Sequence, residues 1–217
     1  MAKKIQDKNK GPIYPEKGDN NLDYTEANLK TLLRKYPLRK IVKKEKTEYK
    51  KLIALSKWVG EQWQHGREMD QWLDPVRRHN AVEILKKAHK GGRFNCLYFA
   101  TVLATCAVAL GYRARRVYII GHVVAEIWSE DYQKWILFDP DDRVHFEAAG
   151  IPLSAFELQQ AVRRRKVADI TLLQLKPWPH FLEKPPALKV GSKDYESWRM
   201  DKRNRSVKRY RNITRYM

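Results

Sequence analysis

Cys96 occupies the first position of a predicted helix in the segment GGRFNCLYFATVLATCAVALG, residues 91–111. The apolar run predicts a helix from Cys96 to Leu110 that is buried on nearly all sides, and Gly111 is a typical stop signal. Asn95 is a favoured N-cap residue, so it places Cys96 where backbone amides are unpaired and the helix dipole is positive. Both effects favour a thiolate over a thiol. The position therefore suits a cysteine nucleophile.

A histidine and an aspartate that could serve this nucleophile lie on the segments that follow. These segments are rich in Val, Ile, Tyr and Trp with a period of two, which predicts three antiparallel strands: 113–120, 122–128 and 134–139. We expect the last two to form a hairpin around residues 130–131, with Ser129 opposite Tyr132, a register that pairs His122 with Asp139. Facing side chains have Cβ atoms about 4.5–5.5 Å apart, within reach of an imidazole–carboxylate hydrogen bond.

A cysteine at a helix start, a histidine on a strand and an aspartate on the neighbouring strand match the arrangement for nucleophilic acyl transfer. The alternative is that all three are structural, since a buried cysteine is more often an inert core residue. Cys106 keeps that structural interpretation, because ten residues at about 100° each turn it away from Cys96. The two Cα atoms lie about 15 Å apart on one helix, too far for a disulfide. Two free thiols favour a reducing, cytoplasmic location.

Further helices are predicted to hold these residues in place. Their starts carry capping residues, and Gly or Pro ends several of them: Thr25 to Pro37, about Thr47 to Gln64, Asn80 to Gly91, and Ser154 to about Arg165. Residues 66–79 hold Gly and Asp-Pro without periodicity, which predicts a loop. The first residues lack the apolar stretch of a secretory signal, and no apolar run reaches the length of a membrane span.

Three blocks of the sequence, in this order, resemble the core of the transglutaminase-like superfamily: GGRFNCLYFATVLATCAVALGYRARRV, GHVVAEIW and KWILFDPD. The segments HFEAAGIPLSAFELQQAV and WVGEQWQHG are similar to bacterial members of that group, and the resemblance runs from about Glu45 to about Lys166. Many members have Trp two residues after the histidine, where this chain has Val124. The resemblance implies an α+β, papain-like core in which N-terminal helices, including the cysteine helix, pack on an antiparallel sheet.

By the same resemblance, Cys96 is the nucleophile, His122 the base and Asp139 the orienting acid. The implied reaction is attack on an amide carbonyl of a protein or peptide to form a thioester, followed by hydrolysis, deamidation or transglutamination. Some members of the superfamily have lost activity, so a silent module is the alternative. The backbone amide of Cys96 is a natural oxyanion donor, and Gln62, Trp63 and Gln64 are candidates for a second donor or for substrate binding. We expect no cofactor and no metal, because the Cys and His residues lack zinc-ligand spacing.

The chain is strongly basic, with 44 Lys and Arg against 25 Asp and Glu and a formal net charge of +19. Such a charge predicts attraction to nucleic acid, a membrane surface or another polyanion. Basic residues gather near the carboxyl end with tyrosines between them: Arg199, Lys202, Arg203, Arg205, Lys208, Arg209, Arg211 and Arg215. This composition could bind phosphates and stack on bases, whereas a solvated tail is the other interpretation. A catalytically silent module that binds a polyanion through this tail is thus the second function.

The composition divides the chain into three predicted parts. Residues 1–24 form a flexible polar arm, residues 25–177 the transglutaminase-like domain, and residues 178–217 a basic C-terminal tail rich in Pro, Lys and Arg. A length of 217 residues is enough for one domain with a substantial core and extensions.

Overall fold

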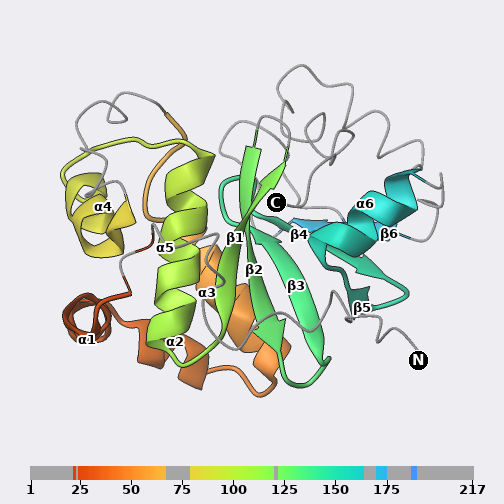
Figure 1. The fold of residues 1–217 in the computed structure, drawn as a ribbon, viewed down its shortest axis with the longest axis horizontal. Helices are drawn as coiled ribbons and strands as arrows, with labels where there is room; N and C mark the ends of the chain where they lie inside the picture. The colour runs from red at the N-terminus through yellow and green to blue at the C-terminus, as the bar shows by residue number, and fades with distance from the viewer. Residues whose placement is uncertain are drawn as a thin grey trace, which may run out of the picture.

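The computed structural model describes residues 22, 24–66, 79–119, 122–163, 170–174 and 187–189. Within these residues the fold is α+β, with the N-terminal helices packed on an antiparallel sheet, as predicted (Figure 1). The sheet has the strand order β1-β2-β3-β4-β6-β7, and β5 pairs with β4. No described helix has the length and apolar character that crossing a membrane requires.

The helices are α1 (Glu26–Lys35), α2 (Leu38–Lys43), α3 (Glu48–Gly60), α4 (Ala81–Ala88), α5 (Cys96–Ala109) and α6 (Ala155–Arg163). The strands are β1 (Ala114–Ile119), β2 (His122–Ser129), β3 (Lys134–Asp139), β4 (Val144–Ala148), β5 (Ile151–Pro152), β6 (Ile170–Gln174) and β7 (Ala187–Lys189).

The predicted caps begin the helices as expected. The side chain of Thr25 accepts a hydrogen bond from the N–H of Asn28, and the side chain of Asn80 accepts one from the N–H of Glu83. Helix α2 was not predicted. Pro37 was expected only to end the preceding helix, but it is also the N-cap residue of α2. Helix α3 ends earlier than predicted, at Gly60 rather than near Gln64.

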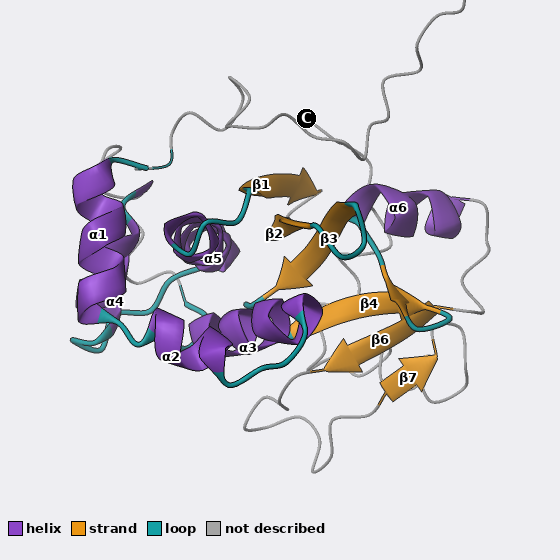
Figure 2. Cartoon of the chain, turned by 90° about the horizontal axis from the view of Figure 1, so that it is seen from below, coloured by secondary structure: helices purple, strands orange, loops and turns teal. Residues whose placement is uncertain are grey.

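Helix α5 is the centre of the hydrophobic core. It contacts α1, α3 and α4 on one side and β1 and β2 on the other, and Figure 2 shows it end-on between them. Every residue from Tyr98 to Ala107 is buried, as its uniformly apolar sequence predicts. Each fully buried large apolar side chain stabilises the fold by about 1.5–3 kcal/mol. The buried part of α5 therefore fixes the position of the helix, and Cys96 lies two residues before it.

The β2–β3 hairpin has a different register from the predicted one. Its turn covers residues 130–133, so Ser129 faces Lys134 instead of Tyr132. The larger turn ends at Gln133 with φ 51°, and Glu48 of α3 accepts hydrogen bonds from two backbone N–H groups of the turn, at 3.2 and 3.1 Å. The predicted pairing was therefore wrong by two residues. An even shift keeps each side chain on its own face of the sheet.

Glu126 on β2 links the sheet to α6. Its side chain is fully buried, with one oxygen 2.8 Å from the Arg115 guanidinium of β1 and the other accepting the backbone N–H of Ala155 at 2.8 Å. A buried carboxylate needs such partners, because an unpaired buried charge is costly. Ser154 and Glu157 form the predicted capping box at the start of this helix.

Strands β4, β5, β6 and β7 were not predicted. Strand β4 pairs with β3 on one edge and β6 on the other, and β7 pairs with β6. Strand β7 lies within the range assigned to the basic tail, 178–217. The proposed domain boundaries at residues 24 and 177 stay predictions. The loop expected at 66–79 lies almost entirely outside the described residues.

Candidate active site

Cys96 is the first residue of α5 and is partly exposed. The side chain of Asn95 accepts a hydrogen bond from the backbone N–H of Leu97 at 3.0 Å, which fixes the predicted cap. Cys106, by contrast, is completely buried, and burial raises the pKa of its thiol. Neither cysteine is in a disulfide. Of the two thiols, Cys96 is the one that a reagent can reach.

His122 and Asp139 meet at the buried ends of β2 and β3. The Nε2 atom of His122 lies 2.7 Å from Oδ2 of Asp139, and both side chains are fully buried. The other oxygen of Asp139 accepts the backbone N–H groups of Asp141 and Asp142, both at 3.1 Å. The two residues are not directly cross-strand partners, but they share a face, so the expected contact forms despite the corrected register. The backbone of the following turn therefore holds Asp139, and Asp139 orients the imidazole of His122.

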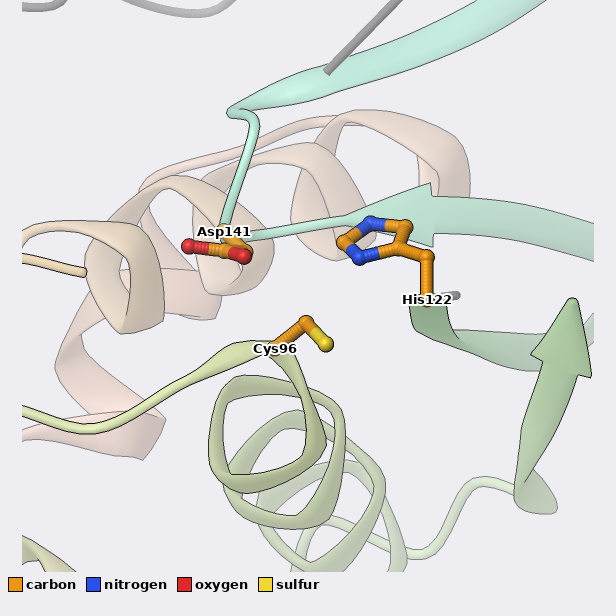
Figure 3. A group of neighbouring side chains, drawn as sticks. All are labelled: Cys96, His122 and Asp141. Atoms are coloured by element: carbon orange, nitrogen blue, oxygen red, sulfur yellow. The ribbon is translucent and has the colours of Figure 1, made fainter. Parts of the chain in front are cut away.

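The second ring nitrogen of His122 faces the sulfur of Cys96. Because Nε2 is bound to Asp139, the nitrogen that faces the sulfur in Figure 3 is Nδ1. Burial alone lowers the pKa of His122, but the charge and hydrogen bond of Asp139, the hydrogen bond with Cys96 and the charge of Asp142 outweigh it. The net effect raises the pKa well above the ordinary value of 6.5. His122 is therefore a strong proton acceptor placed beside a thiol.

Asp141 and His65 join the site, although sequence reasoning did not single out either. Both carboxylate oxygens of Asp141 lie 2.9 Å from Nδ1 of His65. Residue 65 forms a parallel bridge with Phe94, and the N–H of Gly66 donates to the Phe94 carbonyl at 3.1 Å. This bridge brings His65 beside the start of α5. The signals that could have found the pair are the histidine of WQHG and the acidic run DPDD.

The predicted substrate-binding residues directly precede His65 in the sequence. The side chains of Gln62 and Trp63, however, contact residues other than Cys96, His122 and Asp139. The side chain of Gln62 donates to the Trp58 carbonyl at 2.8 Å and bonds His89 at 3.0 Å. Trp63 is buried and stacks on Phe99, with ring centroids 4.2 Å apart. Gln64 is exposed. Their role at the site stays a prediction, and the eight basic residues from Arg199 to Arg215 lie outside the described residues.

Two groups of side chains in the described part of the chain offer ligand atoms that could hold a metal ion. In the first, the sulfur of Cys96, a ring nitrogen of His122 and a carboxylate oxygen of Asp141 all lie within 4.8 Å of one another (Figure 3). In the second, His122 is grouped with Asp139 and Asp142. The first group combines three ligand types that zinc accepts.

Comparison with known proteins places this site within a recognised domain. Residues 37–140, which include Cys96, His122 and Asp139, match the family model of the transglutaminase-like superfamily. Among solved structures, the chain is similar to a candidate cysteine protease from Cytophaga hutchinsonii, with 18% sequence identity and a TM-score of 0.42. That match covers 52% of this chain and 37% of the other, so this chain spans little more than a third of that protein's length. No curated protein matches the chain.

Proposed function

Because the chain contains a domain of the transglutaminase-like superfamily, we propose that it catalyses cysteine-dependent acyl transfer on amides of proteins or peptides. One observation carries the proposal: His122 is held by Asp139 at 2.7 Å through one ring nitrogen while the other faces the thiol of Cys96. A thiol, a base and a fixed acid in this order are the parts that a cysteine nucleophile requires.

The first half of the proposed reaction forms a thioester. His122 Nδ1 accepts the proton of the Cys96 thiol, and the sulfur attacks the carbonyl carbon of the amide. As the tetrahedral intermediate collapses, the C–N bond breaks and His122 returns the proton to the leaving amine or ammonia. Asp139 stabilises the imidazolium between these two proton transfers. We assign the binding of the oxyanion to the backbone N–H of Cys96, because an N–H in the first turn of a helix has no partner within the helix.

The second half releases the acyl group. A water molecule or a primary amine gives a proton to His122 and attacks the thioester carbon, the C–S bond breaks, and Cys96 regains its proton. Water yields hydrolysis of a peptide bond or deamidation of a glutamine, and a lysine amine yields a cross-link. All three outcomes use the same three side chains.

Alkylation of Cys96 by iodoacetamide, read by mass spectrometry, tests whether the site is assembled. We expect Cys96 to react faster than Cys106, and His122→Ala to slow its reaction by at least about tenfold. Asp139→Asn should lower the rate in the same direction, because it removes the charge that supports the imidazolium. Equal alkylation of Cys96 with and without His122 would contradict the proposal.

A second experiment identifies the reaction. The chain is incubated with a glutamine-rich protein such as casein and a fluorescent primary amine, with Cys96→Ser as the matched control. Ammonia release with amine incorporation indicates transglutamination, ammonia release alone indicates deamidation, and new peptide amino termini indicate hydrolysis. Products that persist in the Cys96→Ser control would show that another group or a contaminant is responsible.

The net charge of +19 supports a second candidate function, binding of a polyanion by a catalytically silent domain. This function predicts binding to RNA or heparin that weakens steeply with added salt and is lost when residues 199–217 are removed. Normal polyanion binding together with a Cys96 that reacts no faster than Cys106 would favour it over the enzyme.

A further inference from the structure

We propose that Cys96, His122 and Asp141 form a binding site for a thiophilic divalent cation, with Zn²⁺ as the fitting ion, and that the bound ion reversibly blocks the nucleophile. The regulatory consequence rests on the proposed function, whereas binding of the ion does not. None of the three residues is assigned to a metal by the family match.

The geometry of the three ligand atoms is close to that of a zinc site. They lie within 4.8 Å of one another. Zinc bonds of about 2.0–2.3 Å in a tetrahedron place ligand atoms roughly 3.3–3.8 Å apart. Closing the difference takes an inward movement of about 1 Å, which small rotations of the partly exposed Cys96 and of the Asp141 carboxylate can supply. Figure 3 shows all three side chains directed at a common space.

The ligand types select the metal. A thiolate, an imidazole and one carboxylate suit Zn²⁺, whereas Ca²⁺ and Mg²⁺ require mostly oxygen ligands. The thiolate and the carboxylate together carry two negative charges, so a bound Zn²⁺ leaves the group neutral. Neutrality matters because His122 and Asp141 are almost completely buried, at 3% and 2% exposure. Three protein ligands leave a fourth position open on the exposed side of Cys96.

Both buried ligands already have the supporting contacts that metal ligands need. A histidine ligand normally donates its other ring N–H to a carboxylate, and His122 does so to Asp139 at 2.7 Å. The Asp141 carboxylate is held in turn by His65 at 2.9 Å. Sites with such supporting contacts hold their ligands oriented before the ion arrives.

The second group, His122 with Asp139 and Asp142, is the weaker candidate. An ion there would have to displace the hydrogen bond between His122 and Asp139, and the group contains no thiolate. The group with Cys96 keeps that hydrogen bond. A zinc ion bound to it would occupy the sulfur and Nδ1, the two atoms that the acyl transfer requires. The chain would then be inactive when zinc is available and active when zinc is withdrawn.

The first test uses the full chain stripped of metal with EDTA. Titration with Zn²⁺ against a chromophoric chelator should show binding, and Co²⁺ should give the near-ultraviolet sulfur-to-metal charge-transfer band of a cobalt thiolate. Stoichiometric Zn²⁺ should slow alkylation of Cys96 by at least about tenfold, since a metal-bound thiolate is a poor nucleophile, and EDTA should restore the rate. Ca²⁺ and Mg²⁺ should have no effect, and Cys106 monitors unfolding.

Two neighbouring substitutions form a matched pair. Asp141→Asn removes a ligand, so zinc affinity should fall by about ten- to a hundredfold. Asp142→Asn changes the next buried carboxylate of the same turn and should leave zinc protection intact. Protection is measured within each variant as the ratio of Cys96 alkylation rates without and with zinc, so changes in basal reactivity cancel. Cys96→Ser should lack the cobalt charge-transfer band. Any zinc that this variant still binds in the chelator titration is bound at another site.

The proposal is overturned if Zn²⁺ fails to protect a reactive Cys96, or if Asp141→Asn is protected as well as the unaltered chain. These outcomes differ from failure of the proposed function, which appears without metal as Cys96 alkylation that does not depend on His122. A chain that binds zinc through Cys96 but shows no His122-dependent reactivity without metal would keep the metal site and discard the catalytic one.

Discussion

Gly60 is the last residue of α3, and we predict that its lack of a side chain allows the turn at residues 140–143 to pack closely against α3. A Cβ atom at this position would lie 2.5 Å from the carbonyl oxygen of Pro140 and 3.2 Å from Cγ of Arg143. Pro140 stands between Asp139, which orients His122, and Asp141. The substitution Gly60→Ala therefore pushes on the backbone that positions both aspartates.

Two opposing effects decide how much Gly60→Ala changes the free energy of unfolding. Ala is favoured over Gly within a helix by up to about 1 kcal/mol. Overpacking in a close contact costs about 1–3 kcal/mol, and the obstructing atom belongs to the backbone rather than to a flexible side chain. Reaching an ordinary contact distance requires the Pro140 carbonyl to move by about 0.9 Å or more. We expect a net loss of roughly 1 kcal/mol in the free energy of unfolding.

The effect on the site should be larger than the effect on stability. A displacement of this size is enough to break the 2.7 Å hydrogen bond between Asp139 and His122. Misplacement of a catalytic group by about 1 Å costs up to about a hundredfold in rate. Alkylation of Cys96 in Gly60→Ala should therefore be at least about tenfold slower, while urea unfolding shows a modest loss of stability.

Gly111→Ala is the matched control. Gly111 has a φ of +93°, and no atom lies within 4 Å of the position that a Cβ would take, so alanine there strains the backbone without touching the site. Its stability should fall by about 1 kcal/mol, with Cys96 alkylation unchanged. The reasoning is refuted if Gly60→Ala keeps the full alkylation rate, or if Gly111→Ala loses as much of it.

Three further predictions concern stability. Glu48 accepts three hydrogen bonds from the β2–β3 hairpin, one from the Ser129 side chain and two from the turn, so Glu48→Ala should lower the free energy of unfolding by about 2 kcal/mol in urea titration; no loss would show that the hairpin is stable without Glu48. The His145 ring, whose Nε2 lies 3.7 Å from the Glu147 carboxylate, and the hydrogen bond that Tyr49 donates at 2.9 Å lower the pKa of Glu147 from 4.5, so this stabilisation is present above pH 4.5 and lost as pH falls through the folded value. Tyr49→Phe should therefore lower the free energy of unfolding by about 1.5 kcal/mol at neutral pH and by less in acid. A loss that does not change with pH would show that it does not depend on the ionised Glu147 carboxylate. Because burial raises the pKa of Cys106, its alkylation in urea should follow unfolding measured by circular dichroism, and rapid labelling of the native chain would contradict this.

Helix starts could be predicted from the sequence because their causes are local. Asn95 and Asn80 each cap a helix by bonding an amide two or three residues further on, so residue type and spacing suffice. The burial of α5 followed from its uniformly apolar composition. Cys96 could thus be placed at a helix start before any tertiary contact was known.

The sheet was predicted less completely because its pairings depend on distant residues. Strand β4 pairs Val144 with Gln174 on β6, a partner that no local pattern specifies. The β2–β3 register was wrong because the turn is longer than expected, and Glu48, from a helix far away in the sequence, binds that turn. The His122–Asp139 contact was nevertheless predicted, since the error was an even number of residues.

The sequence by itself determined which residues could carry the chemistry: an N-capped cysteine, a histidine and an aspartate on adjacent strands. Only the tertiary structure decided that His65 and Asp141 join them, because packing between separate elements sets which side chains share a space. The close approach of Gly60 to Pro140 is part of that packing. Helix caps and the apolar pattern of a helix involve residues that are close in the chain, so the local sequence specifies them, whereas the meeting of distant side chains depends on how the whole core fills its volume.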